Sequence, residues 1–283
     1  MAVDDGYFGP GSVSWRVHRE VTVLFGGARA VLLHAAHPLV IAGANQTGMY
    51  ERNPWRRLQR TLVLQYALTF GTRGEAIAAA NRINEIHQRI NGIDPVTGRR
   101  YDALDPSLLL WVHACLVESA LLFERLTVGA LGDADRQRFH EEQMVAAELV
   151  RLPKAAIPPT VHELERYVAE TARSGELLVT DAARSVAGLF LDPPRDAQWR
   201  PVLRLVARLA FATLPPEVRE AYGVRPDPGL AWIAFPTIRA IRPLLPHRVR
   251  FIAPYQRWQA RRRSGRDDGS VEALRRSLGI RLE

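Results

Sequence analysis

Apolar residues recur at intervals of three or four along almost the whole chain, which is the spacing of one face of an α-helix. We find no convincing run of alternating β-branched and polar residues, the pattern of a half-buried strand. The turn segments between the periodic stretches are short, too short to separate two domains. The sequence therefore predicts an all-α fold with a single multi-helix domain over residues 1–283 and a basic C-terminal tail from about 254 to 283.

Proline, glycine and capping residues divide the first half of the chain into helices. Gly26 and Gly27 are expected to break a first helix, and Pro38 is expected to bend or end the second. Asp105 followed by Pro106 predicts a helix start, because aspartate caps free N–H groups and proline suits the first turn. The elements expected in this half are helices over residues 14–24, 28–38, 54–70, 75–91 and beyond 106, a polar loop over 43–53 and a helix cap at Asn91-Gly92.

The second half is more amphipathic and less distinctive. Thr160 and Glu163 form a capping box, the signature of a helix N-terminus. The helices expected here lie near residues 134–151, 160–173, 180–191, 198–213 and 216–223, with one or two more between 227 and 259.

The composition is that of a soluble globular protein, with 47% hydrophobic and 24% charged residues. The net charge is +8, and arginines crowd the end of the chain between residues 239 and 266. This crowding has two interpretations, a solvated tail or a weak attachment to an acidic membrane surface or partner. No recognisable nucleic-acid module accompanies the arginines, so we expect no nucleic-acid partner.

Cys115 is the only cysteine, which excludes an internal disulfide and a zinc site of the cysteine type. The first residues include two aspartates and no apolar run, so they do not read as a secretory signal, and we expect a cytoplasmic protein. The most apolar window, residues 28–44, is interrupted by charged and polar residues, and predicts a buried helix rather than a membrane span.

Histidines on apolar faces are the main candidates for chemistry. His87 and His113 occupy the predicted inner stripes of two successive helices. Each is either a hydrogen-bonded core histidine or a metal ligand, and spacing alone favours the core interpretation. His34 and His37 are three positions apart, which suits two ligands on one face or tight helix packing. The predicted stripes are Ile77, Ala80, Ile83, His87 and Ile90, then Leu109, His113, Leu116, Val117 and Ala120.

Carboxylates near these histidines do not follow a known ligand pattern. None of Glu85, Glu118 and Glu124 forms the Glu-x-x-His motif of a di-iron bundle. Arg57 and Thr61 share a helix face with two leucines, and a guanidinium on an inward face needs an anionic partner. Glu118, Asp105 or the carboxylates of a cofactor could be that partner, and spacing alone favours an internal ion pair.

Five motifs in the same order carry a resemblance to a known family. They are GGARAVLLHAAHPLVIAG, RNPWRRLQRT, FGTRGEA, IHQRINGIDPVTGRRYDALDP and LLLWVHACLVES. They resemble the family that includes the MpaB oxygenases and the latex-clearing proteins, and the resemblance runs from about Trp15 to Gly223. Latex-clearing proteins have a helical, globin-like core that holds a b-type haem, and they cleave the double bonds of polyisoprene with dioxygen.

The resemblance implies roles for individual residues. His87 matches the axial histidine and is expected to be the proximal ligand of haem iron. Arg57 and Thr61 match a paired arginine and threonine near the distal side. Arg60 stands where the rubber enzymes have a lysine that caps the iron, and a guanidinium is a poorer ligand because it stays protonated. His113 matches a motif without an assigned role and could stabilise the pocket.

Three functions follow as hypotheses. The first is a b-type haem-dependent oxygenase that uses dioxygen to oxidise or cleave an apolar substrate, such as an alkene or isoprenoid. The second is a haem- or ligand-binding protein without turnover, such as a sensor or carrier. The third is a helical scaffold whose histidines are structural and whose function lies in the basic C-terminal region.

Overall fold

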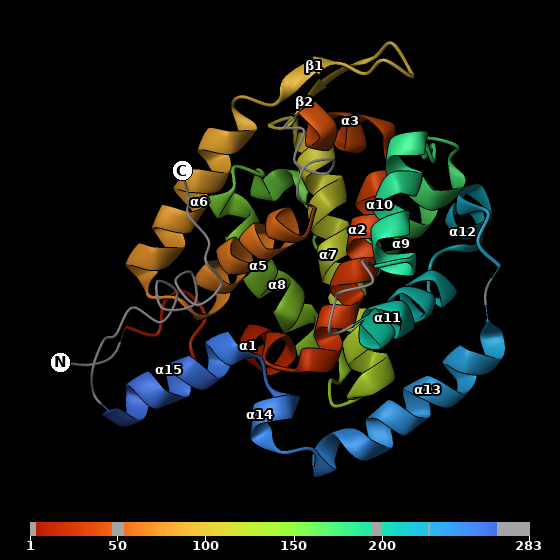
Figure 1. Ribbon diagram of the computed structural model, residues 1–283. Helices are drawn as coiled ribbons and strands as arrows, with labels where there is room; N and C mark the ends of the chain where they lie inside the picture. The colour runs from red at the N-terminus through yellow and green to blue at the C-terminus, as the bar shows by residue number, and fades with distance from the viewer. Residues whose placement is uncertain (1–3, 47–53, 194–199, 226, 265–283) are drawn as a thin grey trace.

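The computed structural model describes residues 4–46, 54–193, 200–225 and 227–264 (Figure 1). In these ranges the chain forms fourteen α-helices and a single small sheet of two antiparallel strands. The prediction of an all-α fold is confirmed.

The helices follow one another with short connections. In chain order they are α1 (Val13–His18), α2 (Leu24–Ala36), α3 (Pro38–Gln46), α5 (Pro54–Phe70), α6 (Arg73–His87), α7 (Pro106–Thr127), α8 (Asp133–Leu149), α9 (Val161–Arg173), α10 (Asp181–Leu191), α11 (Arg200–Ala212), α12 (Pro216–Tyr222), α13 (Pro228–Ile241), α14 (His247–Arg250) and α15 (Ala253–Ser264). Short 3₁₀ turns lie at Val21–Val23, Lys154–Ala156 and Arg242–Leu244, and the strands are β1 (Asn91–Ile93) and β2 (Arg100–Asp102).

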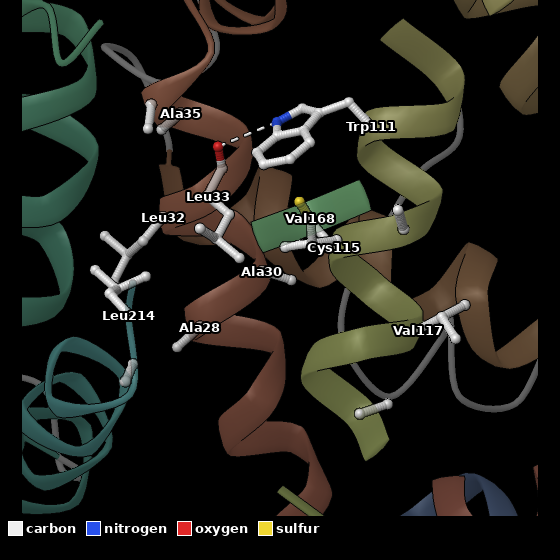
Figure 2. Close-up of a cluster of buried hydrophobic side chains, with 14 of the residues drawn as sticks. Ala28, Ala30, Leu32, Leu33, Ala35, Trp111, Cys115, Val117, Val168 and Leu214 are labelled. Carbon is white, nitrogen blue, oxygen red and sulfur yellow. Dashed lines mark hydrogen bonds between the residues drawn. The ribbon is translucent and has the colours of Figure 1, made fainter. Parts of the chain in front are cut away.

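The centre of the fold is the pair formed by α2 and α7 (Figure 1). Their facing side chains are aliphatic and small, and Trp111 of α7 donates a hydrogen bond from its indole nitrogen to the Leu33 carbonyl of α2, at 3.3 Å (Figure 2). A buried indole N–H needs such a partner, so the bond fixes how the two helices are placed along each other. Helices α9, α10 and α11 cover the other sides of this pair.

Two parts of this core are apolar enough to cross a membrane by length and composition. They are α7, and α2 with α3 taken together despite a bend of 98° between them. However, 56% of the apolar window of α7 is buried inside the protein, which is also the behaviour of a core helix. The bend falls at His37 and Pro38, as the position of the proline predicts.

The pair α5 and α6 lies beside this core as a hairpin of two helices (Figure 1). Thr72 caps α6 and Glu75 completes a capping box with it. Small side chains, Ala76 and Ala80, pack with Leu68 of α5. The hairpin is therefore held by a small apolar cluster.

The C-terminal helices are packed onto the body of the protein. Tyr255 and Trp258 of α15 are buried against Trp15 of α1, whose ring lies 4.2 Å from that of Trp258 between centroids. Arg242 and Arg250 bind the carboxylate of Glu20, which is only 2% exposed. The solvated interpretation of the terminal arginines is therefore wrong for Arg242 and Arg250. Residues 265–283 lie outside the described part.

The prediction that Gly26 and Gly27 break a helix is wrong, because α2 runs through both. The break lies earlier, where Glu20 forms an isolated antiparallel bridge with Phe251. Gly26 serves close packing, since a Cβ at this position would lie 2.6 Å from the Ser119 carbonyl oxygen on α7. The missing side chain allows α2 and α7 to approach each other closely.

Two further predictions about local structure are wrong. The expected loop over 43–53 begins as helix, because α3 continues to Gln46; residues 47–53 lie outside the described ranges. Asn91 and Gly92 do not cap α6 but begin β1, and Gly92 pairs with Tyr101 of β2.

The predicted inner stripes are also partly wrong. Ile77 of α6 and Leu116 of α7 are 42% and 39% exposed, whereas Ala76 and Ala79 are buried. Small residues make the contact because they allow α6 to lie close to its neighbours.

Candidate functional site

His87 is the last residue of α6, at the point where the chain enters the β1–β2 hairpin (Figure 1). Its side chain is half-buried, and its Nδ1 atom is buried with no hydrogen-bond partner among the described residues. Burial lowers the pKa of the imidazole below its ordinary value, which keeps the ring neutral. A neutral imidazole with an unengaged nitrogen is the form that can ligate a metal ion.

One hydrogen bond holds the end of α6 that carries His87. The side-chain amide of Asn84, nearly one turn earlier, donates to the Leu149 carbonyl at the end of α8, at 3.0 Å. This amide is buried, so the bond ties α6 to the main bundle. Helical periodicity did not predict a buried role for Asn84, because it identifies buried positions by apolar residues only.

The other predicted site residues lie on α5. Thr61 is exposed and lies on the helix that packs against α6. Arg57 and Arg60 lie on the same helix, but the side chains of residues 54–60 are outside the described part. A short turn joins α5 to α6, so Arg57 and Thr61 in the first half of α5 and His87 at the end of α6 all lie remote from that turn.

His113 occupies a different environment, on α7. Its Nε2 atom is buried without a hydrogen-bond partner among the described residues. Burial, together with the nearby His140 of α8, lowers the pKa of His113 to about 3. The Nε2 of His140 lies 2.8 Å from the Pro158 carbonyl, and burial lowers the pKa of His140 as well. The histidine whose charge acts on the pKa of His113 is thus His140.

The two histidines of α2 have separate partners. His34 Nε2 lies 3.0 Å from the carbonyl oxygen of Val112 on α7, so the packing interpretation is confirmed for this residue. His37 ends α2, and its Nε2 lies 3.6 Å from the carboxylate of Glu176. Burial lowers the pKa of His37, which weakens the ionic character of this contact.

An ion pair that spacing did not reveal joins the two central helices. Arg29 of α2 is 3% exposed and binds both carboxylate oxygens of Glu118 on α7. It also donates to the Ser119 hydroxyl at 2.7 Å and to the Thr213 carbonyl at 3.0 Å. Glu118 was one expected partner of Arg57, and the partner that the structure shows for it is Arg29. The signal in the sequence was an arginine inside the most apolar window.

No group of three His, Cys, Asp or Glu side chains in the described part of the chain could hold a metal ion by itself. One cleft, of about 680 Å³, lies where α7 ends and where α8 and α9 begin. Its wall carries both signs of charge, with Glu124, Glu165, Arg136 and Arg239 among its residues. His87 and His113 are not among the residues that line it.

Comparison with known proteins identifies the chain. A family model described as "ER-bound oxygenase mpaB/B'/Rubber oxygenase, catalytic domain" matches residues 15–247. The chain belongs to this family. The match extends beyond the range of the five motifs, through α13 to the start of α14. The matched residues therefore correspond to the part of these proteins that the family description calls the catalytic domain.

Two curated relatives match part of the chain. The uncharacterized protein Mb2261 of Mycobacterium bovis and the uncharacterized protein Rv2237 of Mycobacterium tuberculosis are each 25% identical to the chain over 178 residues. This alignment covers 62% of the chain and 62% of each relative, so the chain matches less than two thirds of their length. No solved structure matches the chain.

Proposed function

We propose that this protein is a haem b-dependent oxygenase that uses dioxygen to oxidise or cleave an apolar substrate, with His87 as the protein ligand of the iron. Within a family of oxygenase catalytic domains, the observation that carries the proposal is the state of His87. It is neutral, half-buried and at a helix end, with a buried nitrogen that no described residue engages.

A haem fits this donor set better than a free metal ion does. A porphyrin supplies four nitrogen ligands of its own, so the protein needs to supply only one axial histidine. When bound, the haem would supply the redox chemistry that activates dioxygen. In this proposal the chain binds the iron through His87, and Asn84 holds the end of α6 against α8.

The residues of α5 complete the proposed site. Arg57 is the cation that would face the haem carboxylates or the oxygen side, and Thr61 is the hydroxyl that would orient a polar atom there. Arg60 gives this protein no neutral amine ligand, since a guanidinium stays protonated, so this residue would not compete with dioxygen for the haem. His113 has a supporting role in the bundle core, beside His140.

The test is the absorption spectrum of the full chain expressed with ample haem, oxidised and reduced. We expect a Soret band that disappears in His87→Gly and returns when free imidazole is added, because imidazole can replace the missing axial ligand. His162→Gly, which changes an exposed histidine, should keep the band. A wild-type protein without a Soret band, or a His87→Gly protein with an unchanged one, would exclude His87 as a haem ligand.

Turnover needs a second measurement. We expect the haem-loaded protein to consume dioxygen only when an apolar alkene, such as an isoprenoid oligomer, is added. Reversible oxygen binding without consumption, for any such substrate, would instead support the sensor or carrier function.

A further inference from the structure

Exposed apolar side chains concentrate on the segment from α13 to α14. Trp232 and Leu244 are 80% and 82% exposed, more than any other large apolar residue in the described part of the chain. Ile233, Ile241 and Val249 add to this surface. Large apolar side chains are normally kept from water, so such a cluster marks a surface that meets another phase or partner.

Helix α13 is apolar on both of its sides. Its inner side packs through Phe235 and Ile238 against Phe123 of α7 and Leu209 of α11. The opposite side is largely apolar, with Arg239 as the charged residue of the helix, and its other exposed residues are Gly229, Trp232, Ile233, Pro236, Thr237 and Ala240. Apolar helix faces are normally buried, whereas this side of α13 lies at an edge of the molecule (Figure 1).

The net charge of the protein is located in the C-terminal stretch that begins with this segment, and four of the eight arginines of that stretch, at positions 239, 242, 248 and 250, lie within the segment itself. Residues 1–227 contain 26 basic and 26 acidic residues, and residues 265–283 contain four of each. Residues 228–264 contain eight arginines and no acidic residue, so they account for the whole net charge of +8. Arg242 and Arg250 bind Glu20, while Arg248 is exposed beside Val249.

We propose that this segment, named here the α13–α14 edge and comprising residues 228–250, binds the surface of a membrane that contains anionic lipid. Tryptophan prefers the boundary between headgroups and acyl chains, and leucine, isoleucine and valine enter the apolar layer below it. Arginines at the same edge meet the lipid phosphates. The ligand is therefore the bilayer surface, and the protein lies on it rather than spanning it.

Charge argues against a second copy of this chain as the occupant. A twofold dimer would place the edge against itself, and its arginines would meet arginines without any acidic residue of the segment between them. A nucleic acid would use the arginines and could stack a base on the tryptophan, but it offers no apolar phase to the exposed leucine, isoleucine and valine side chains. A membrane surface uses both features.

The test is cosedimentation of the full chain with vesicles of phosphatidylcholine alone, or with about one third phosphatidylserine. We expect binding to the anionic vesicles that weakens in high salt. Trp232→Ser with Leu244→Ser should lower the partition coefficient roughly tenfold or more, because two large side chains no longer enter the bilayer. The matched control is Ile93→Ser with Val96→Ser, which changes two residues of the β1–β2 region that are 64% and 60% exposed.

Fluorescence gives an independent readout. Lipids brominated on their acyl chains should quench a tryptophan component that is lost in Trp232→Phe. Absence of binding to anionic vesicles would overturn the proposal. It would also be overturned if the Ile93→Ser, Val96→Ser control lost as much vesicle binding as the Trp232→Ser, Leu244→Ser variant. A lipid-free dimer that the edge variant dissociates, or DNA binding without vesicle binding, would overturn it as well. None of these results depends on haem, so a failed Soret experiment leaves this test unaffected.

Discussion

The α2–α7 pair and the α5–α6 pair are both packed helix pairs that carry histidines, but they are held together differently. The first pair has a glycine at its closest approach, a buried Arg29–Glu118 ion pair and the Trp111 hydrogen bond. The second has a small apolar cluster, against which Leu149 of α8 packs, and the Asn84 amide donates a hydrogen bond to the Leu149 carbonyl.

His87 and His113 have similar local properties but lie in these two different helix pairs. His87 and His113 each have a buried nitrogen without a hydrogen-bond partner among the described residues, and burial lowers the pKa of both. His113 lies within α7, beside His140 of α8, while His87 lies at the end of α6, where the chain enters the β1–β2 hairpin. An unengaged nitrogen alone does not mark a ligand; its place in the fold must also admit one.

The largest effect should come from breaking the core pair. Arg29→Met leaves the Glu118 carboxylate largely buried without its cation, and should lower the free energy of unfolding by about 3–5 kcal/mol. Urea denaturation followed by circular dichroism measures this change. The control is Arg82→Met, which breaks the exposed Arg82–Glu85 pair of α6 and should cost less than about 0.5 kcal/mol.

The ion pair itself is open to a sharper test. Arg29→Met combined with Glu118→Leu should recover much of the lost stability, because no buried charge is then left unpaired. If the single and double variants are equally unstable, packing of the Arg29 side chain, not its charge, holds the two helices together.

Acid should weaken the core in a way that depends on its histidines. Burial lowers the pKa of His113 to about 3 and that of His18 to about 4. The unfolded chain binds protons near pH 6.5, so the stability contributed by the neutral rings is complete above that pH and lost as the pH falls toward 4 and 3. Between pH 7 and pH 5 the burial of each neutral ring should lower the free energy of unfolding by about 2 kcal/mol.

Replacing one of these histidines measures how much it contributes to the pH dependence of stability. His113→Leu should lose about 2 kcal/mol less stability than the wild type between pH 7 and pH 5, because the group that titrates on unfolding is gone. His162→Gln, at an exposed position, should leave the pH dependence unchanged. An unchanged slope in His113→Leu would mean that His113 has the same pKa in the folded and the unfolded protein.

The smallest effect should come from the contact that fastens α6. Asn84→Ala removes the hydrogen bond to the Leu149 carbonyl and should lower the free energy of unfolding by about 1 kcal/mol. In the haem-loaded protein it should also speed haem loss, because the end of α6 would be less well held. Asn81→Ala, an exposed position of the same helix, should change neither quantity.

Local signals in the sequence predicted much of the helical architecture. Asp105 with Pro106 starts α7, and Thr160 with Glu163 starts α9, because these interactions involve residues close together in the chain. Contacts between distant residues overrode other local signals. Gly26 lies inside a helix since α7 approaches it, and the Asn91-Gly92 pair begins a strand since β2 offers it a partner.

In the candidate site, too, local features could be predicted from the sequence and contacts between distant residues could not. The motif around His87 was recognisable, and the fold places it at the end of α6 beside a helix that carries Thr61. The pairing of Arg29 with Glu118, 89 positions apart, and the approach of His113 to His140 could not be predicted, because periodicity gives the face of a residue but not what it faces.

The buried carboxylate of Glu20 has a consequence for how the chain matures. Its cations, Arg242 and Arg250, follow it by 222 and 230 positions. At usual rates of translation a ribosome needs roughly 10 to 45 s to deliver them. During that interval the nascent N-terminal segment holds an acidic group that cannot yet be buried at low cost. The native packing around Glu20, just after the end of α1, can therefore form only after the last helices have been synthesised.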